Sequence, residues 1–363
     1  MNPVLESYRT LLLMSGRYRL ASRLPPLSVG VSLTTRCNSR CRMCDNWKSR
    51  SGKELRIKDI TGILESLETL SVDNVNFAAN GEIFTHPDIR EILKAAADRG
   101  FDITLNTNAL ALSDRDLARF VSREVKPLLI SIGLDTTDSD LYEQIRGIPN
   151  GFDRVDRAIS NLRSFGCGNI TIGSVILDTN MESIPGLLDY VKENRLPSLR
   201  FTAYQKYFQG DDAIWEKLRE PGTNRDLKRM VSDLAHARKR HPALRNSREY
   251  LLRIPDFHQS VKYFPFPCLV GYLRMDVDES GEATLCPFIG DSLGNIRETD
   301  LASMWFSEKA STLRERMVRG DCPGCWLSCY AEENIRLTFR HGLRSNLEGL
   351  TRYMRIKRDH GSV

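Results

Sequence analysis

An α/β fold with parallel strands is the architecture that this sequence predicts. Between residues 28 and 206, short β-prone runs alternate strictly with longer stretches whose apolar residues recur at helical spacing. Such alternation implies parallel strands that are joined by right-handed helical crossovers. The six predicted strands are Ser28–Thr35, Asp73–Ala79, Asp102–Asn106, Lys126–Leu134, Asn169–Leu177 and Ser198–Ala203.

Helices are predicted between these strands from the same periodicity. In the last of them, Ile184, Leu187, Leu188 and Val191 fall on one face, as expected for a helix packed on a sheet. We interpret these apolar stripes as core. The predicted helices are Ile57–Leu70, Pro87–Arg99, Asp114–Ser122, Phe152–Phe165 and Met181–Glu193.

The remainder of the chain differs in composition. Val4–Leu20 has an apolar face interrupted by charges, which predicts an amphipathic helix and argues against a secretory signal. The C-terminal segment is basic and helical in pattern; we expect it to pack on the fold, with contact to a membrane surface or nucleic acid as the alternative. We divide the chain into an N-terminal helix (1–27), an α/β core (28–206), a connecting helical segment (207–261), a cysteine-bearing module (262–330) and a basic C-terminal helix (331–363).

Length and charge limit the possible functions. The 363 residues are enough for a barrel with a smaller module. A net charge of +5 permits an anionic substrate without demanding nucleic acid, and no nucleic-acid partner is expected. Because no run of about 18 apolar residues occurs, the sequence predicts no transmembrane segment. We expect a cytoplasmic protein.

Nine cysteines are bunched toward two ends of the chain. An odd count without a signal peptide argues against a secreted disulfide framework and favours reduced thiols that bind metal. Cys167 stands alone between two glycines, and we interpret it as a plain small residue.

The first group, Cys37, Cys41 and Cys44, follows the first predicted strand with the spacing CxxxCxxC. One loop with this spacing can wrap a cubane iron–sulfur cluster, and three thiolates leave the fourth iron open to a ligand. The alternative is a structural zinc knuckle, but the loop contains no fourth ligand.

This loop resembles the signature of the radical S-adenosylmethionine (SAM) superfamily, and later segments resemble other elements of that family. Asn80-Gly81-Glu82 resembles the turn that holds the methionine amino group, and Arg146 the arginine that meets the methionine carboxylate. Met43 stands where the family usually has an aromatic residue, and it can still pack on adenine. The resemblance assigns cofactor contacts to Met43, Asn80, Gly81, Glu82, Asn106, Ser131, Asp135 and Arg146.

The resemblance implies a partial (β/α)6 TIM barrel that binds SAM on a [4Fe-4S] cluster. It also implies a 5′-deoxyadenosyl radical that takes hydrogen from a substrate C–H bond, and a flavodoxin- or ferredoxin-like reductant. The positions of the matched segments agree with this role. Each follows a predicted strand, and ligands of parallel α/β folds bind at the carboxyl ends of strands.

The second group of cysteines resembles the SPASM/twitch extension of the same superfamily. Cys268, Gly281 and Cys286 fit its opening pattern, and the other three cysteines follow closely spaced. Five thiols suffice for one auxiliary [4Fe-4S] cluster, with a zinc site as the alternative. The expected ligands are Cys268, Cys286, Cys322 and Cys325; Cys329 is either a replacement ligand or a hydrogen donor to a substrate radical.

The motifs leave the substrate open. Only 36 residues precede Cys37, one auxiliary cluster is expected, and no cobalamin domain is recognisable. These features favour oxidation or epimerisation of a polar small molecule, such as a sugar or aminocyclitol. The alternatives are a peptide- or protein-modifying maturase and a non-catalytic iron–sulfur electron-transfer protein. Candidate substrate-binding residues are Arg200, Tyr204, Gln205 and Lys206.

Overall fold

The computed structural model describes residues 3–48, 53–206, 210–260 and 265–338. In these residues one sheet has the strand order β6-β5-β4-β3-β2-β1-β7-β8-β9. Strands β1 to β7 pair in parallel, whereas β8 and β9 are antiparallel additions at the β7 edge. The strands are β1 (Ser28–Ser32), β2 (Asn74–Ala78), β3 (Asp102–Thr107), β4 (Leu129–Gly133), β5 (Ile170–Ile176), β6 (Ser198–Ala203), β7 (Arg274–Val277), β8 (Glu282–Thr284) and β9 (Gly294–Asn295).

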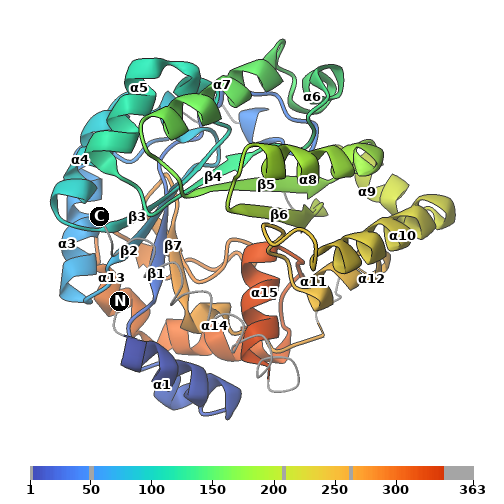
Figure 1. Cartoon of the computed structure of the whole chain (residues 1–363). Coiled ribbons are helices and arrows are strands. Elements are labelled where there is room, and N and C mark those ends of the chain that lie inside the picture. The colour runs from blue at the N-terminus through green and yellow to red at the C-terminus, as the bar shows by residue number, and fades with distance from the viewer. Residues whose placement is uncertain (1–2, 49–52, 207–209, 261–264, 339–363) are drawn as a thin grey trace.

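Helices cover the outer face of this curved, open sheet (Figure 1). The crossover helices are α3 (Ile57–Thr69), α4 (Ile89–Asp98), α5 (Arg115–Phe120), α6 (Ser139–Arg146), α7 (Gly151–Ser164) and α8 (Ile184–Glu193). The remaining helices are α1 (Pro3–Met14), α2 (Tyr18–Ala21), α9 (Asp212–Arg219), α10 (Pro221–Ala237), α11 (Arg248–Leu252), α12 (Ile254–Gln259), α13 (Leu301–Trp305), α14 (Glu308–Arg319) and α15 (Ser328–Leu337). Among the described helices we find none with the length and apolar character needed to span a bilayer.

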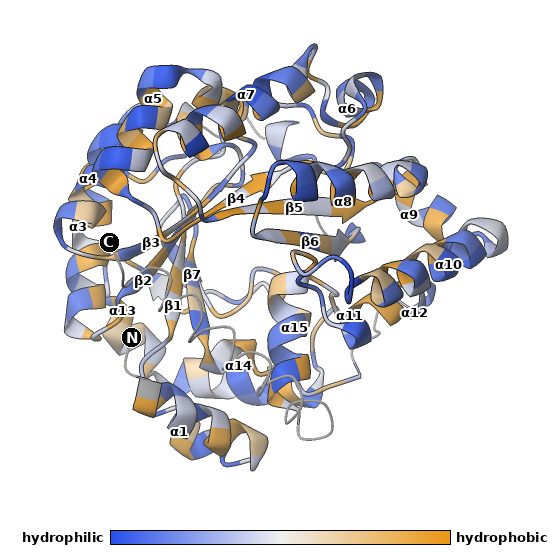
Figure 2. Cartoon of the chain, viewed as in Figure 1, coloured by the Kyte–Doolittle hydropathy of each residue, from blue (hydrophilic) through white to orange (hydrophobic). Residues whose placement is uncertain are grey.

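The two faces of the sheet have opposite character. Side chains such as Phe77 and Ile132 point outward and form the core with the helices, and Figure 2 shows the apolar strands beneath helices whose outer surfaces are polar. A parallel sheet that is buried on both faces normally consists of nearly continuous apolar runs. Here the outward-facing residues of the strands are apolar, whereas the inward-facing ones include polar residues that are not fully buried. These are Asn76, Asn106, Ser131, Arg200, Thr202, Arg274 and Asp276. The space bounded by this inner face, which we call the lumen, is therefore lined by polar side chains that are not fully buried.

Helix α15 spans the open side of the barrel between β6 and β7 (Figure 1). The Ser328 and Thr202 hydroxyls lie 2.8 Å apart, which fixes the helix to β6. Tyr330 donates its hydroxyl hydrogen to Asp276 on β7 at 3.2 Å. One turn of α15 thus joins the two strands on either side of the gap.

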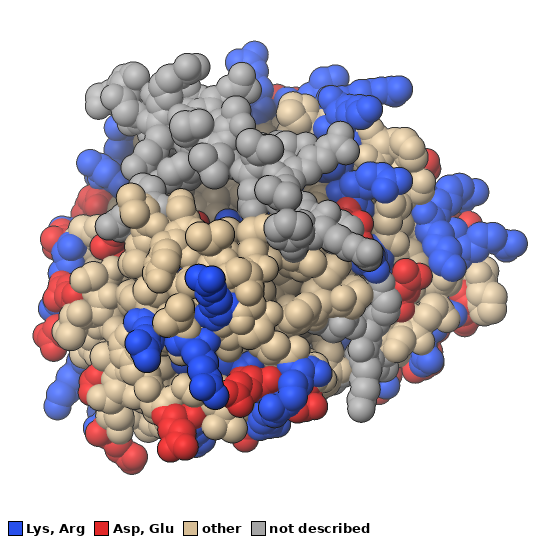
Figure 3. Space-filling view, turned by 90° about the horizontal axis from the view of Figure 1, so that it is seen from below, with Lys and Arg blue, Asp and Glu red and all other residues tan. Residues whose placement is uncertain are grey.

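Helix α1 attaches the C-terminal module to the underside of the barrel. Leu12 and Leu13 form a second small core with Leu269 and Leu273. Arg9 is buried and donates to the Tyr272 carbonyl at 2.8 Å. Figure 3 shows this underside, where Lys and Arg alternate with Asp and Glu around a largely uncharged area.

The six predicted strands are present as β1 to β6, and β6 has the predicted bounds. β1 ends at Ser32 because the following residues enter the cysteine loop, and β4 begins only at Leu129 because Lys126 has a left-handed backbone, φ 50°. The predicted helices are also present; Met181–Ser183 forms a 3-10 turn before α8.

Three features of the chain differ from the sequence-based prediction. The N-terminal helix is broken into α1 and α2, because Gly16 adopts φ +73° after the first of them. Helix α6 was not predicted. The boundary at residues 330/331 falls inside α15, and most of the basic C-terminal segment (331–363) lies outside the described residues.

Candidate active site

The cysteine loop after β1 is fixed against the end of α6. The Arg40 amide donates to the Arg146 carbonyl at 3.0 Å, and the Arg42 amide donates to the Ile145 carbonyl at 2.9 Å. The Trp47 indole donates to the Cys41 carbonyl at 3.3 Å. These bonds satisfy loop groups that would otherwise be unpaired, and they hold the three cysteines at the carboxyl end of the sheet.

A cavity of about 320 Å³ opens at this end of the sheet. Cys37, Cys41 and Cys44 line one side of it, and residues that follow β2, β3 and β6 line the others. A cavity at the carboxyl ends of parallel strands is the usual place for a ligand in an α/β fold.

The three thiols favour the protonated state when no metal is bound. Burial raises the pKa of Cys37 to about 11 and also raises the pKa values of Cys41 and Cys44. Arg146 opposes this shift at Cys41, since its Nη1 lies 4.0 Å from the sulfur. Thiols of this kind lose their protons on binding metal, so cluster assembly at this loop releases protons.

Glu82 is locked into the wall of the cavity. Its carboxylate accepts hydrogen bonds from the Thr107 hydroxyl at 2.5 Å and from the Asn108 amide at 2.6 Å. Burial raises its pKa, and these donors lower it. A Cβ on Gly81 would lie 1.9 Å from the Arg36 carbonyl, so only glycine fits where this turn crosses the cysteine loop.

Arg146 projects into the cavity from the end of α6 with its charge balanced from behind. Its Nε donates to Asp135 at 2.6 Å, and Asp135, which is fully buried, also accepts from the Val175 amide. Burial lowers the pKa of Arg146, but Asp135, Cys41 and Tyr142 together outweigh this effect and raise the pKa above its usual value. A Cβ on Gly133 would lie 2.8 Å from Arg146 Nη2, so this glycine makes room for the guanidinium.

The second cavity lies in the C-terminal module. Cys268, Cys286, Cys322 and Cys325 line it, and Tyr330 forms part of its wall. Burial raises the pKa of Cys268 to about 11 and of Cys286 to about 12; Cys322 adds to the shift of Cys268, and Cys268 adds to that of Cys286. Asn334 accepts a hydrogen bond from the Leu269 amide at 2.6 Å, which orders the backbone beside Cys268.

The donor sets fit clusters rather than single ions. Within the described ranges, no three His, Cys, Asp or Glu side chains are grouped to hold one metal ion. A zinc ion requires its ligands to converge on one point, whereas a cubane places its irons at separate corners and takes thiolates from the rim of a cavity. The thiols of both groups lie around cavities in this way.

Family comparison agrees with this geometry. The radical SAM superfamily model matches residues 31–191, and the model of an iron–sulfur cluster-binding domain, SPASM, matches residues 268–330. The chain belongs to the radical SAM superfamily. Its cofactors are therefore a SAM-binding [4Fe-4S] cluster, SAM itself and an auxiliary cluster in the SPASM domain.

Curated relatives within the superfamily have diverse activities. A probable GTP 3′,8-cyclase of Methanocella arvoryzae is 30% identical, but the match covers 46% of this chain and 53% of the relative, about half its length. An AdoMet-dependent heme synthase of Methanosarcina barkeri is 23% identical over 83% of this chain and 88% of that protein. The PqqA peptide cyclase of Rhizobium meliloti is 23% identical over 79% and 75%.

Among solved structures, SuiB of Streptococcus suis bound to its precursor peptide SuiA is similar to this chain. The TM-score is 0.63 at 19% identity, and the match covers 82% of this chain and 69% of SuiB. At this identity the likeness shows a shared fold and no more.

Most of the predicted SAM contacts lie together. Met43, Asn80, Gly81, Glu82, Asn106 and Arg146 all line the first cavity with the three cysteines. Ser131 and Asp135 do not line it; Ser131 lies on the inner face of β4, and Asp135 is occupied by Arg146. A direct cofactor contact for these two residues stays a prediction without support from this geometry.

Some lining residues were not predicted as cofactor contacts. Trp47 follows the third cysteine closely, and an aromatic residue at that spacing was an available signal. Thr202 carries no motif, and only the curvature of the sheet brings it to the cavity.

The four candidate substrate residues after β5 separate in the structure. Tyr204 and Gln205 line the SAM cavity, and Lys206 lies on the surface 3.9 Å from Asp212. Only Arg200 lies on the inner face of β6, directed to the lumen. Cys167 is buried near the start of β5.

Proposed function

We propose that this radical SAM protein modifies a peptide or protein substrate. The proposal rests on how much of the chain is similar to peptide-modifying proteins. The similarity to the PqqA peptide cyclase runs through both the barrel and the C-terminal module, as does the likeness to SuiB in its complex with a precursor peptide. The substrate of such an enzyme would lie between the barrel and the C-terminal module. Similarity over both modules therefore includes the surfaces that would contact the substrate.

A non-peptide substrate is the second candidate. The sequence by itself favours oxidation or epimerisation of a sugar or aminocyclitol, and the heme synthase match, over 88% of that protein, keeps a small molecule in consideration. The comparisons support the peptide alternative better than a sugar, because peptide-modifying proteins recur among the similar chains.

In the proposed site, Cys37, Cys41 and Cys44 hold the SAM cluster. When bound, the cluster and SAM supply a 5′-deoxyadenosyl radical able to take hydrogen from an unactivated carbon. Arg146 binds the methionine carboxylate with a charge that Asp135 keeps oriented. The Asn80–Glu82 turn binds the methionine amino group, and Met43 packs against adenine.

For the auxiliary cluster we propose Cys268, Cys286, Cys322 and Cys325 as ligands, since these four thiols share one cavity. Cys329 is then free to act as a hydrogen donor. Its S–H hydrogen would form the new C–H bond at the substrate radical. The sulfur radical left on Cys329 would take one electron from a flavodoxin- or ferredoxin-like reductant and one proton before the next turnover.

The function is tested with anaerobically reconstituted, reduced protein and SAM. Peptides encoded beside the gene are incubated with it, and mass spectrometry detects a loss of two hydrogens or deuterium incorporation from heavy water. We expect modification of one such peptide together with 5′-deoxyadenosine, and neither product from the Cys37, Cys41 and Cys44 triple alanine variant. If small-molecule extracts stimulate 5′-deoxyadenosine formation and no peptide does, the second candidate replaces the first.

A further inference from the structure

The geometry of α15 directs Cys329 into the lumen. Successive helix residues are rotated by about 100°. Ser328 contacts Thr202 on β6, and Tyr330 contacts Asp276 on β7. Cys329, between them in the chain, therefore projects between the two strands. This placement explains why Cys329 is exposed and yet desolvated enough by the surrounding protein to have a raised pKa.

Charged groups of the inner face surround the Cys329 thiol. Its electrostatic neighbours are Arg274, Asp276 and Arg200. Arg274 is neutralised, because its Nη2 lies 3.0 Å from Asp276 Oδ1 and its guanidinium lies over the Tyr330 ring. The Asp276 carboxylate in turn fits only because β1 has Gly30 beneath it, where a Cβ would lie 2.1 Å from Oδ1.

Arg200 is different, since it makes no hydrogen bond or ion pair with any described residue and is exposed. The nearest acidic influence is Glu332 on α15, whose carboxylate accepts a hydrogen bond from the Ser247 amide at 2.7 Å. An unpaired, exposed guanidinium on the inner face of a strand is suited to a carboxylate, which it can bind through two parallel hydrogen bonds.

Arg200 shares its strand face with a residue that lines the SAM cavity. Thr202, two residues beyond Arg200 on the same strand face, lines that cavity. Two residues on one face of a strand are separated by roughly 7 Å. A substrate group bound to Arg200 would thus lie about 7 Å along the strand from the SAM cavity and beside the Cys329 thiol.

We propose that the lumen contains a carboxylate-binding site formed by Arg200 beside Cys329, and that the substrate is anchored there by a carboxylate close to the reacting carbon. The inference rests on the proposed function for its substrate and deepens it by naming the group that is recognised. The carboxylate belongs either to a peptide or to a free carboxylic acid.

Alkylation of the anaerobic holoenzyme tests the site without knowledge of the substrate. Iodoacetate carries a carboxylate and iodoacetamide does not; with each, the Cys329 sulfur forms a thioether as iodide and the thiol proton leave. We expect the iodoacetate-to-iodoacetamide rate ratio at Cys329 to exceed that of glutathione about tenfold. Arg200→Gln should return the ratio to the glutathione value.

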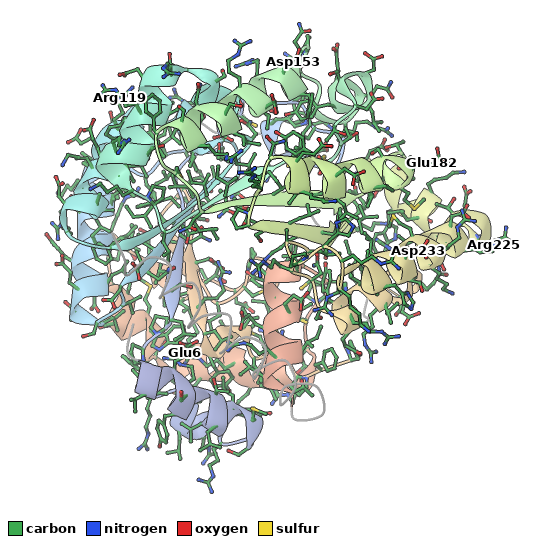
Figure 4. The ribbon with its side chains drawn as sticks, in the orientation of Figure 1. Glu6, Arg119, Asp153, Glu182, Arg225 and Asp233 are labelled. Atoms are coloured by element: carbon green, nitrogen blue, oxygen red, sulfur yellow. The ribbon has the colours of Figure 1, made fainter. Side chains whose placement is uncertain are left out.

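Arg225→Gln is the matched control, because Arg225 lies exposed on the outside of α10 (Figure 4). It should leave the ratio at Cys329 unchanged. A ratio equal to that of glutathione in the parent, or one unaffected by Arg200→Gln, overturns the proposal. So does alkylation of Cys329 that removes iron from the auxiliary cluster, since Cys329 would then be a ligand.

Protection experiments distinguish the source of the carboxylate. The probes are glutarate, a five-residue alanine peptide with one central glutamate and blocked termini, and the same blocked peptide with glutamine. Protection of Cys329 by the glutamate peptide at lower concentration than glutarate assigns a peptide, and protection by glutarate alone assigns a free acid. The carboxylate assignment is overturned if neither glutarate nor the glutamate peptide protects Cys329. It is also overturned if the glutamine peptide protects Cys329 as well as the glutamate peptide does. Because 5′-deoxyadenosine formation and peptide modification are measured separately on the parent, failure of this site is distinguishable from failure of the proposed function.

Discussion

Individual residues of the SAM cavity are held in place by hydrogen-bonding partners from other strands and loops. Asp135 is fully buried and positions Arg146 from behind, while Thr107 and Asn108 hold Glu82. Such pairing offsets the cost of burying charge, and removing one partner of a buried pair leaves the other uncompensated. Cofactor binding therefore depends on these supporting residues as well as on Arg146 and Glu82 themselves.

Asp135→Asn should therefore affect both stability and SAM affinity. The buried Arg146 loses its counter-charge, so we expect destabilisation of about 3 kcal/mol and weaker SAM binding with iron content nearly intact. Denaturant unfolding and equilibrium titration with SAM measure the two effects. Asp116→Asn removes an exposed aspartate that pairs with Arg90 and Arg119, and it should change neither. Unchanged SAM affinity in Asp135→Asn would contradict the positioning role.

Cys329→Ala decides between hydrogen donation and cluster ligation. If the thiol is a donor, the parent incorporates solvent deuterium into the substrate, and the variant loses this product while keeping its irons. The readouts are mass spectrometry in heavy water and iron analysis. If the variant keeps both properties, Cys329 is a bystander, and oxidation without hydrogen return becomes the better interpretation of the reaction.

At the scale of elements, close crossings and short helices place the site. The turn after β2 passes against the cysteine loop, with the Glu82 amide donating to the Arg36 carbonyl at 2.7 Å. Helix α15 connects β6, β7 and the segment before α11 through Ser328, Tyr330 and Glu332. Changes at these crossings should move whole segments rather than single side chains.

Gly81→Ala tests the first crossing. The added Cβ would lie 1.9 Å from a backbone oxygen of the cysteine loop, so the loop must shift. We expect SAM affinity to fall by at least about tenfold, as for the loss of one charge-assisted contact, while the auxiliary cluster stays. Gly62→Ala on α3 is the control, since nothing lies within 4 Å of its new Cβ. Electron paramagnetic resonance with and without SAM reports the difference.

Glu332→Gln tests the attachment of α15. Burial raises the pKa of Glu332 to about 6 from 4.5, so the folded state holds a proton that the unfolded state has lost. The folded protein therefore loses about 2 kcal/mol of stability from this group as pH rises from about 4.5 to 6. The variant should show a flatter decline in thermal stability between pH 5 and 7. Parallel pH profiles of the two proteins would refute this assignment.

The whole molecule combines two cysteine-lined cavities with a polar lumen. One lies at the carboxyl ends of the barrel strands and the other in the SPASM domain. The same sheet runs through both modules by way of the β1–β7 pairing, so their relative position is fixed by backbone hydrogen bonds. Cys329 and Arg200 line neither of these cavities.

Iron content tests this arrangement. Two [4Fe-4S] clusters predict about eight irons per chain. Changing Cys37, Cys41 and Cys44 together to alanine should leave about four and abolish SAM cleavage. Cys167→Ala should keep all of them, since this cysteine is buried away from both cavities. SAM cleavage by the triple variant would contradict the assignment of the first cluster.

The sequence by itself determined that the barrel strands are parallel, and it revealed the two groups of cysteines. Both signals are local: strand–helix alternation is visible in windows of a few residues, and Cys37, Cys41 and Cys44 lie within one loop. The tertiary structure decided that Asp135 supports Arg146, that Cys329 does not line the second cavity, and that Arg200 is an electrostatic neighbour of Cys329. These juxtapositions depend on sheet curvature and on contacts such as Ser328–Thr202, which joins residues 126 positions apart. No local pattern specifies such a contact, because packing of the whole core sets it.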